Sequence, residues 1–225
     1  MATFLAQHRG GGLYSEHVSQ RAGAVLALAS YRLRLSPSTV TLAGVVVGVG
    51  SSAALVRWSS ASALVVGLLV ALGWQFAYAL DCADGQLARV TGRTSPAGAR
   101  LDILCDVAVQ ISVVAGLTAV AAARTPSTPA WLYAVFAGTW MVNLVTSVLA
   151  HGSVAASLVR SRSALVRVVK LARDYGAVIA VCGLVVAFLP AWTVWLLTVM
   201  SIVNGLFLLA SIAQAARSAL TTGSG

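Results

Sequence analysis

Four of the six acidic residues of the chain lie between positions 81 and 106, at spacings that suit the binding of a metal ion. Asp81 and Asp84 are three residues apart and Asp102 and Asp106 are four apart, so each pair would share one face of a helix. Four converging carboxylates repel one another unless cations lie between them. Because oxygen ligands suit hard ions, the pattern predicts a site for Mg²⁺ or Mn²⁺ that also binds substrate phosphates.

The residues around these carboxylates indicate how the two pairs meet and what they bind. Gly92, Pro96 and Gly98 lie between the pairs and allow the chain to turn back on itself, so that the pairs face each other. Gly85 and Gly98 also leave room for a diphosphate to approach the backbone. Arg89 offers a planar fork of donors to a phosphate group.

The composition predicts that these elements are membrane helices. Of the 225 residues, 59% are hydrophobic and only 9% are charged, far from the average of a soluble protein. A membrane-spanning helix needs about 20 mostly apolar residues. Six stretches meet this need, at residues 38–56, 61–80, 101–123, 129–150, 175–189 and 191–216. We therefore expect an all-α, polytopic membrane protein with six transmembrane helices.

The positive charges indicate the orientation of these helices and argue against nucleic acid as a partner. The formal net charge is +9, but thirteen of the fifteen Lys and Arg residues fall on one side of the six predicted spans. The other side carries only Arg57 and Arg124. By the positive-inside rule, both termini and the aspartates lie on the cytoplasmic side of a cell membrane. A basic cytoplasmic face also attracts anionic lipids and phosphorylated substrates.

The chain divides into a terminal segment, a membrane domain and a tail. Residues 1–35 are expected to be cytoplasmic and to contain an amphipathic helix on the membrane surface. The apolar residues of this helix recur at helical spacing, at Val18, Ala22, Val25, Ala29 and Leu33. Ser36 and Pro37 are typical of a helix start and open the membrane domain, residues 36–218, which residues 219–225 follow as a tail.

The aspartates and their neighbours also match a known signature. The chain carries D-x2-D-G-x2-A-R-x8-G-x3-D-x3-D from Asp81 to Asp106, with every fixed position present. It thereby resembles the CDP-alcohol phosphotransferase family, whose members also have six spans after a surface helix. The resemblance implies that Asp81, Asp84, Asp102 and Asp106 bind metal, that Asp106 is also the catalytic base, and that Gly85, Ala88, Arg89 and Gly98 line the CDP site. The chain departs from the family pattern at Ser38, where relatives often carry Asn or Asp.

The resemblance implies a reaction and its partners. A phosphoalcohol group would pass from a CDP-alcohol to the hydroxyl of a small polar alcohol, with release of CMP and with two metal ions at the active site. Likeness to bacterial phospholipid synthases, such as the phosphatidylinositol-phosphate synthases, favours CDP-diacylglycerol as a lipid donor, although a soluble CDP-alcohol is an alternative. The resemblance also implies a homodimer.

A second basic cluster, between the fourth and fifth predicted spans, is a candidate binding site for the acceptor. Arg160, Lys170 and Arg173 could bind a phosphate on the acceptor, which would favour inositol phosphate or glycerol phosphate. The same cluster could instead set the membrane topology and contact lipid headgroups.

Other interpretations of the aspartates lead to different functions. They could form ion pairs with Arg89, Arg93 and Arg100 and only hold a loop together. Intramembrane prenyl transfer also uses aspartate pairs with magnesium diphosphate, but it usually needs two Asp-rich motifs far apart. A small transporter with an acidic cation site is a further alternative, although such sites favour the bilayer midplane.

Overall fold

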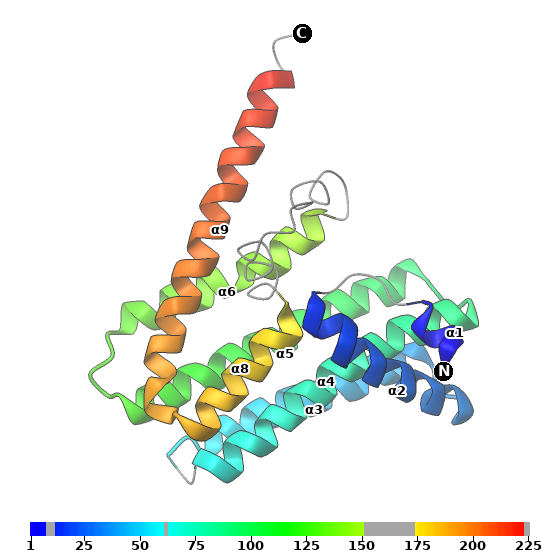
Figure 1. The fold of residues 1–225 in the computed structure, drawn as a ribbon, viewed down its shortest axis with the longest axis horizontal. Coiled ribbons are helices and arrows are strands. Elements are labelled where there is room, and N and C mark those ends of the chain that lie inside the picture. The colour runs from blue at the N-terminus through cyan, green and yellow to red at the C-terminus, as the bar shows by residue number, and fades with distance from the viewer. Residues whose placement is uncertain (8–11, 61–62, 151–173, 223–225) are drawn as a thin grey trace.

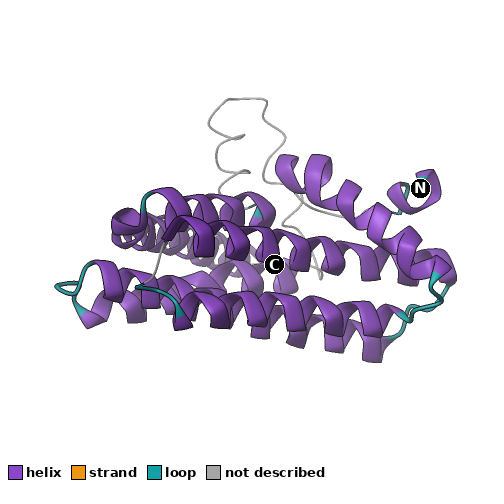
Figure 2. Ribbon diagram, turned by 90° about the horizontal axis from the view of Figure 1, so that it is seen from below, coloured by secondary structure: helices purple, strands orange, loops and turns teal. Residues whose placement is uncertain are grey.

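The computed structural model describes residues 1–7, 12–60, 63–150 and 174–222, and within these ranges every regular element is helical (Figures 1 and 2). The elements in chain order are α1 (Ala2–Leu5), the π-helical turn η1 (Ser15–Ser19), α2 (Gln20–Arg32), α3 (Pro37–Arg57), α4 (Ala63–Thr91), α5 (Pro96–Arg124), α6 (Ala130–Ala150), α8 (Tyr175–Phe188), the short 3-10 turn η3 (Pro190–Trp192) and α9 (Thr193–Thr222). The predicted all-α class is confirmed.

Four of the described helices, α3, α4, α5 and α9, are long and apolar enough to cross a membrane. The predicted fourth and fifth spans coincide with α6 and α8, whose described apolar stretches are shorter. In Figure 1, α3, α4, α5 and α8 lie in one bundle, whereas α9 extends away beside α6 toward the C-terminus. The structure thus supports a membrane protein, and the number of six crossings remains a prediction.

The hairpin of α4 and α5 is longer than the sequence predicts. The two spans were expected at 61–80 and 101–123, but the helices continue until only a short turn separates them. α4 ends at Thr91, and Gly92 follows it with a φ of 65°, the left-handed conformation that glycine adopts readily after a helix end. The side chain of Ser95 then caps α5 by accepting a hydrogen bond of 3.0 Å from the backbone N–H of Gly98. All signature residues therefore lie on rigid helices.

Away from this turn, α3, α4 and α5 are joined by a dense core. Trp74 is almost fully buried, and its indole Nε1–H donates a hydrogen bond of 2.9 Å to Ser52 Oγ. Ser112 donates a second hydrogen bond, of 3.0 Å, to the same oxygen. This junction, together with Leu55 and Leu117 around it, links three helices at one depth.

The N-terminal segment packs onto α4 and differs from an isolated surface helix. Small residues of α2, among them Ala24 and Ala27, are fully buried against α4. The residues that were expected to form the apolar face point outward instead, with Val25 50% and Leu33 70% exposed. One face of α2 thus contacts the protein while the other remains open for the predicted contact with the membrane.

Candidate active site

Three of the four predicted metal ligands converge. Carboxylate oxygens of Asp81 and Asp84 from α4 and of Asp102 from α5 all lie within 4.8 Å of one another. Oδ1 of Asp102 is buried and has no hydrogen-bond partner among the described residues. Because an unpaired buried carboxylate oxygen is costly, this arrangement fits a divalent cation that would receive the three oxygens as ligands. The hairpin thus brings Asp102 beside Asp81 and Asp84, and Asp106 reaches them through a side-chain hydrogen bond with Asp81.

Asp84 is held in place by a residue that was not predicted to belong to the site. Thr41, near the start of α3, donates a hydrogen bond from its hydroxyl to Oδ2 of Asp84. The side chain of Ser36 caps the same helix by accepting a hydrogen bond of 3.1 Å from the backbone N–H of Thr39. The predicted Ser-Pro helix start is therefore confirmed, and it places Thr41 one turn into α3, beside the carboxylates.

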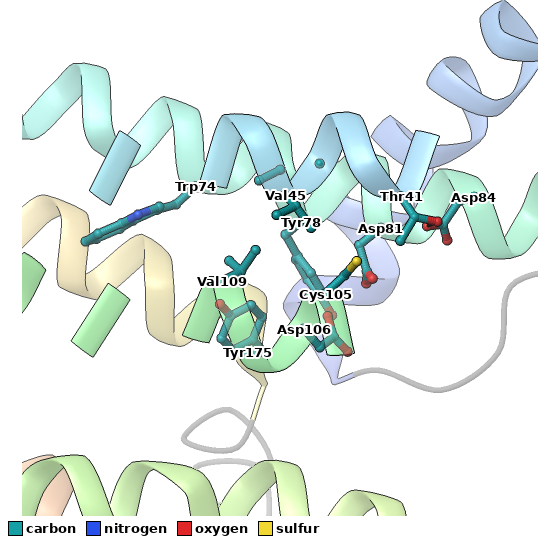
Figure 3. Close-up of a pocket in the computed structure, with 12 residues that line it drawn as sticks. Thr41, Val45, Trp74, Tyr78, Asp81, Asp84, Cys105, Asp106, Val109 and Tyr175 are labelled. Atoms are coloured by element: carbon teal, nitrogen blue, oxygen red, sulfur yellow. Dashed lines mark hydrogen bonds between the residues drawn. The ribbon is translucent and has the colours of Figure 1, made fainter. Parts of the chain in front are cut away.

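Asp106 lies at the edge of this group, where it shares a side-chain hydrogen bond with Asp81, and the two residues border a small cavity, the inner pocket (Figure 3). The inner pocket has a volume of about 30 Å³ and is lined by Thr41, Gly44, Val45, Trp74, Ala77, Tyr78, Asp81, Asp84, Cys105, Asp106, Val109 and Tyr175. Its carboxylates lie at one end, and most of its other walls are apolar. Such a pocket can hold one reacting hydroxyl group beside Asp106.

A larger cavity, the motif cavity, lies on the other side of Asp84. It has a volume of about 340 Å³ and is lined by Ser36, Pro37, Ser38, Thr41, Asp84, Gly85, Ala88, Arg89, Arg93, Thr94, Ser95, Gly98, Ala99 and Asp102. A Cβ on Gly85 would lie 3.1 Å from the Arg89 guanidinium, so the absence of a side chain at Gly85 leaves room for Arg89. Asp84 and Thr41 line both cavities and therefore stand between them.

The orientation of Arg89 depends on the N-terminal segment. Its Nε–H donates a hydrogen bond of 2.8 Å to the backbone carbonyl of Gln7. Three residues earlier on α4, the buried Gln86 donates from Nε2 to the side-chain oxygen of Gln20, at 2.8 Å. The segment before α3 therefore supports the signature helix directly.

The structure places the predicted site residues as follows. Gly85, Ala88, Arg89 and Gly98, which were expected to line the CDP site, all line the motif cavity. The predicted acceptor residues Arg160, Lys170 and Arg173 lie outside the described residues.

Sequence reasoning missed several residues of the inner pocket. Tyr78 precedes Asp81 by one helical turn, a spacing that would have placed both on one face of α4. No comparable signal connects Tyr175 with the aspartates, because it reaches the pocket from α8 through the packing of separate helices.

The comparison with protein families agrees with this geometry. The family described as CDP-alcohol phosphatidyltransferase matches residues 34–208, which is most of the chain. The chain belongs to this family. Its members are membrane-integral transferases of substituted phosphate groups that bind CDP-alcohol donors and alcohol acceptors and generally depend on divalent metal ions. A search of curated proteins finds no match to the chain.

Membership of the CDP-alcohol phosphatidyltransferase family decides between the interpretations of the aspartates. The protein is an enzyme that transfers a phosphoalcohol group from a CDP-alcohol, and the transporter alternative is not favoured. The acidic cluster agrees with the metal dependence of the family.

Proposed function

We propose that the protein transfers a phosphatidyl group from CDP-diacylglycerol to the hydroxyl of a polar acceptor and releases CMP. The observation that carries this proposal is the position of Asp84, whose carboxylate belongs to the metal-binding group and separates the motif cavity from the inner pocket. A diphosphate bound at the aspartates would have the nucleotide on one side and the reacting hydroxyl on the other. Inositol phosphate and glycerol phosphate are the acceptors that we favour.

The motif cavity is suited to the CDP part of the donor. Its volume of about 340 Å³ is within the range of small-molecule sites. Arg89 would bind a phosphate through its guanidinium, while Gly85 and Gly98 let the nucleotide approach the helix backbones. We propose two divalent cations, held by Asp81, Asp84, Asp102 and Asp106. The oxygen ligands suit Mg²⁺ or Mn²⁺. The cations would neutralise the diphosphate and the departing CMP.

Asp106 is proposed as the base because it borders the inner pocket at the edge of the carboxylate group, next to Asp81. The acceptor oxygen would attack the phosphorus that bears the lipid alcohol and form a new P–O bond. The bond from that phosphorus to the bridging oxygen would break, and CMP would leave with the electron pair. The proton of the attacking hydroxyl would pass to the Asp106 carboxylate.

The surroundings of the site support a lipid donor over a soluble CDP-alcohol. The inner pocket has apolar walls that include Val45 and Val109. On α3, Leu42 is 51% and Val46 is 73% exposed, so an apolar surface lies next to the cavity walls. Acyl chains could follow this surface while the diphosphate remains at the aspartates.

We further propose that the active site opens to the cytoplasmic side of the cell membrane, with both termini cytoplasmic and with the outer face of α2 against the lipid. The predicted asymmetry of Arg and Lys supports this orientation. A homodimer and an acceptor site at Arg160, Lys170 and Arg173 remain part of the proposal.

The decisive measurement is CMP release by the purified protein with Mg²⁺ and CDP-diacylglycerol. The acceptors to compare are inositol phosphate, inositol, glycerol 3-phosphate and serine. We expect release with one phosphorylated acceptor, and loss of release on chelation of the metal. In Asp106→Asn we expect donor binding to be retained better than turnover. Equal loss of binding and turnover in Asp106→Asn would contradict the base role, and CMP release only with a soluble CDP-alcohol would contradict the lipid donor.

A further inference from the structure

A buried junction connects the N-terminal segment with the wall of the inner pocket. Asp174, which directly precedes α8, is only 2% exposed, and its Oδ2 accepts a hydrogen bond of 2.9 Å from the backbone N–H of Ser15. The Ser15 hydroxyl donates to Oδ1 of the same carboxylate. The Tyr78 hydroxyl lies 3.0 Å from Ser15 Oγ. Three segments that are far apart in the chain thus meet in one hydrogen-bonded row.

The Asp174 side chain accepts hydrogen bonds from Ser15 and not from its own helix. Asp174 occupies the N-cap position of α8, where an aspartate ordinarily accepts a hydrogen bond from the first turn, but its side chain makes no such bond. It still benefits from the positive end of the helix dipole. Gly176 lets the segments meet, since a Cβ there would come within 2.9 Å of both Ser19 Oγ and a ring carbon of Tyr78. Asp174 and Gly176, at the start of α8, therefore allow Ser15 and Tyr78 to come together.

The row also determines which way the Tyr78 hydroxyl donates. Ser15 has a single hydroxyl proton, which goes to the Asp174 carboxylate, so the Tyr78 O–H must donate to Ser15 Oγ. The phenolic oxygen then has only acceptor capacity left. Tyr78 lines the inner pocket with Asp106, and Tyr175 packs against its ring edge to face, with ring centroids 5.2 Å apart (Figure 3).

We propose that the Tyr78 oxygen accepts a hydrogen bond from the acceptor alcohol in the inner pocket, and that Ser15 and Asp174 are positioning residues that orient it. This inference rests on the proposed function and assigns the N-terminal segment a part in acceptor binding. When the carboxylates of Asp81 and Asp106 are both ionised, they and Tyr78 would present only hydrogen-bond acceptors to the incoming molecule. The pocket would select a hydroxyl-bearing group at this point and leave any phosphate of the acceptor outside it.

The orientation of Tyr78 can be tested without turnover. 3-Fluorotyrosine at position 78 gives a fluorine resonance that responds to hydrogen bonding of the ring hydroxyl. We expect Ser15→Ala and Asp174→Asn to move this resonance in the same direction. The matched control is Tyr14→Phe, which removes a hydroxyl from the same neighbourhood but not from the pocket. An unchanged resonance in Ser15→Ala and Asp174→Asn would overturn the proposal.

Tyr14 suits this control because its hydrogen bond leads elsewhere. Its hydroxyl donates to the side-chain oxygen of Gln75, at 3.3 Å, and it does not line the inner pocket. Burial and the Asp174 carboxylate raise the pKa of Tyr14, so its hydroxyl is protonated at neutral pH.

Kinetics test the contact with the acceptor. Loss of one neutral hydrogen bond predicts that Tyr78→Phe and Ser15→Ala each raise the acceptor KM about tenfold and leave the KM for CDP-diacylglycerol unchanged. Ser15→Ala should add nothing in the Tyr78→Phe background, and Ser15→Thr, which keeps a hydroxyl, should restore the wild-type value. A purely structural role would lower thermal stability and the active fraction with the acceptor KM unchanged, and that result would contradict the proposal.

Failure of the proposed function would be visible separately. If the wild type releases no CMP with any acceptor, the proposed reaction is wrong. Addition of glycerol 3-phosphate or inositol phosphate to the fluorinated protein, in the presence of CDP and Mg²⁺, then tests the contact alone. A shifted resonance that Ser15→Ala weakens would support the Tyr78 contact, whereas no shift with either alcohol would overturn it.

Discussion

The α4–α5 hairpin has two ends that are built from the same helices in opposite ways. At one end, Trp74 and Ser112 bond to Ser52 of α3, and apolar side chains fill the space between the helices. At the other end, Asp81, Asp84 and Asp102 bring negative charge together beside two cavities. The first end stabilises the fold, whereas the second lowers its stability and forms the candidate active site.

The packed end explains why the carboxylates can remain close together. Like charges within 4.8 Å repel one another, and in the absence of a cation they tend to separate α4 from α5. The packed end opposes that separation, because Ser52 of α3 bonds both to Trp74 of α4 and to Ser112 of α5. The two ends should therefore respond in opposite ways to substitution, with activity sensitive at the carboxylate end and stability at the packed end.

The largest expected effect is on activity at the carboxylate end. Asp102→Asn removes one charge from the group of three and should reduce CMP release by about 100- to 1,000-fold. In EDTA its thermal stability should equal or exceed that of the wild type, because a repulsion is relieved. Activity and thermal unfolding, each with and without Mg²⁺, check both statements. A marked loss of stability in EDTA would mean that the aspartates act as structural ion-pair partners.

The packed end should show the largest loss of stability with Gly67→Ala. A Cβ at this position would lie 2.5 Å from the Cα of Ala187, so the backbones of α4 and α8 would have to move apart. We expect a destabilisation of about 3 kcal/mol, with turnover per folded molecule retained. Reversible unfolding in mixed micelles measures the first quantity, and active-site-normalised CMP release measures the second. A loss of turnover without a loss of stability would remove the distinction between the two ends.

A smaller effect is expected where the packed end uses hydrogen bonds. Ser52→Ala leaves the buried Trp74 indole N–H without its acceptor, which should cost about 1–2 kcal/mol. Ser52 lines neither cavity, so turnover should fall far less than in Asp102→Asn. In the matched double variant, Trp74→Phe with Ser52→Ala, the cost should be less than the sum of the two single substitutions. Additive costs would show that the two side chains act independently.

The smallest effect is expected on the outer surface of the bundle. Among the described residues, no atom outside the local helix lies within 4 Å of a Cβ built on Gly50, so Gly50→Ala meets no obstacle there and increases helix propensity. It should stabilise the protein by about 0.5–1 kcal/mol and leave CMP release unchanged. This variant is also the control for Gly67→Ala. A loss of stability would indicate that another surface, such as a second copy of the chain, packs there.

Features that depend on neighbours in the sequence could be predicted without the structure. The all-α class and the apolar helices follow from hydrophobicity and periodicity, and the start of α3 at Ser36 and Pro37 follows from capping chemistry. Metal chemistry follows from the spacing of the aspartates, and the family match over residues 34–208 agrees with it. The helical spacing of the aspartates places them on helices, but the predicted spans of 61–80 and 101–123 stop short of the ends of α4 and α5, because polar residues replace apolar ones there while helical hydrogen bonding continues.

Which distant groups meet depends on the packing of whole helices. Asp106 of α5 shares a side-chain hydrogen bond with Asp81 of α4, 25 residues away in the sequence. Thr41 reaches Asp84 from 43 residues away, and Ser15 reaches Asp174 from 159 residues away. The periodicity of a helix determines which face a residue occupies, but the partner of that face depends on how whole helices pack. For this reason the sequence alone predicts the family and its acidic site, whereas the packing of the helices determines which residues surround the reacting groups.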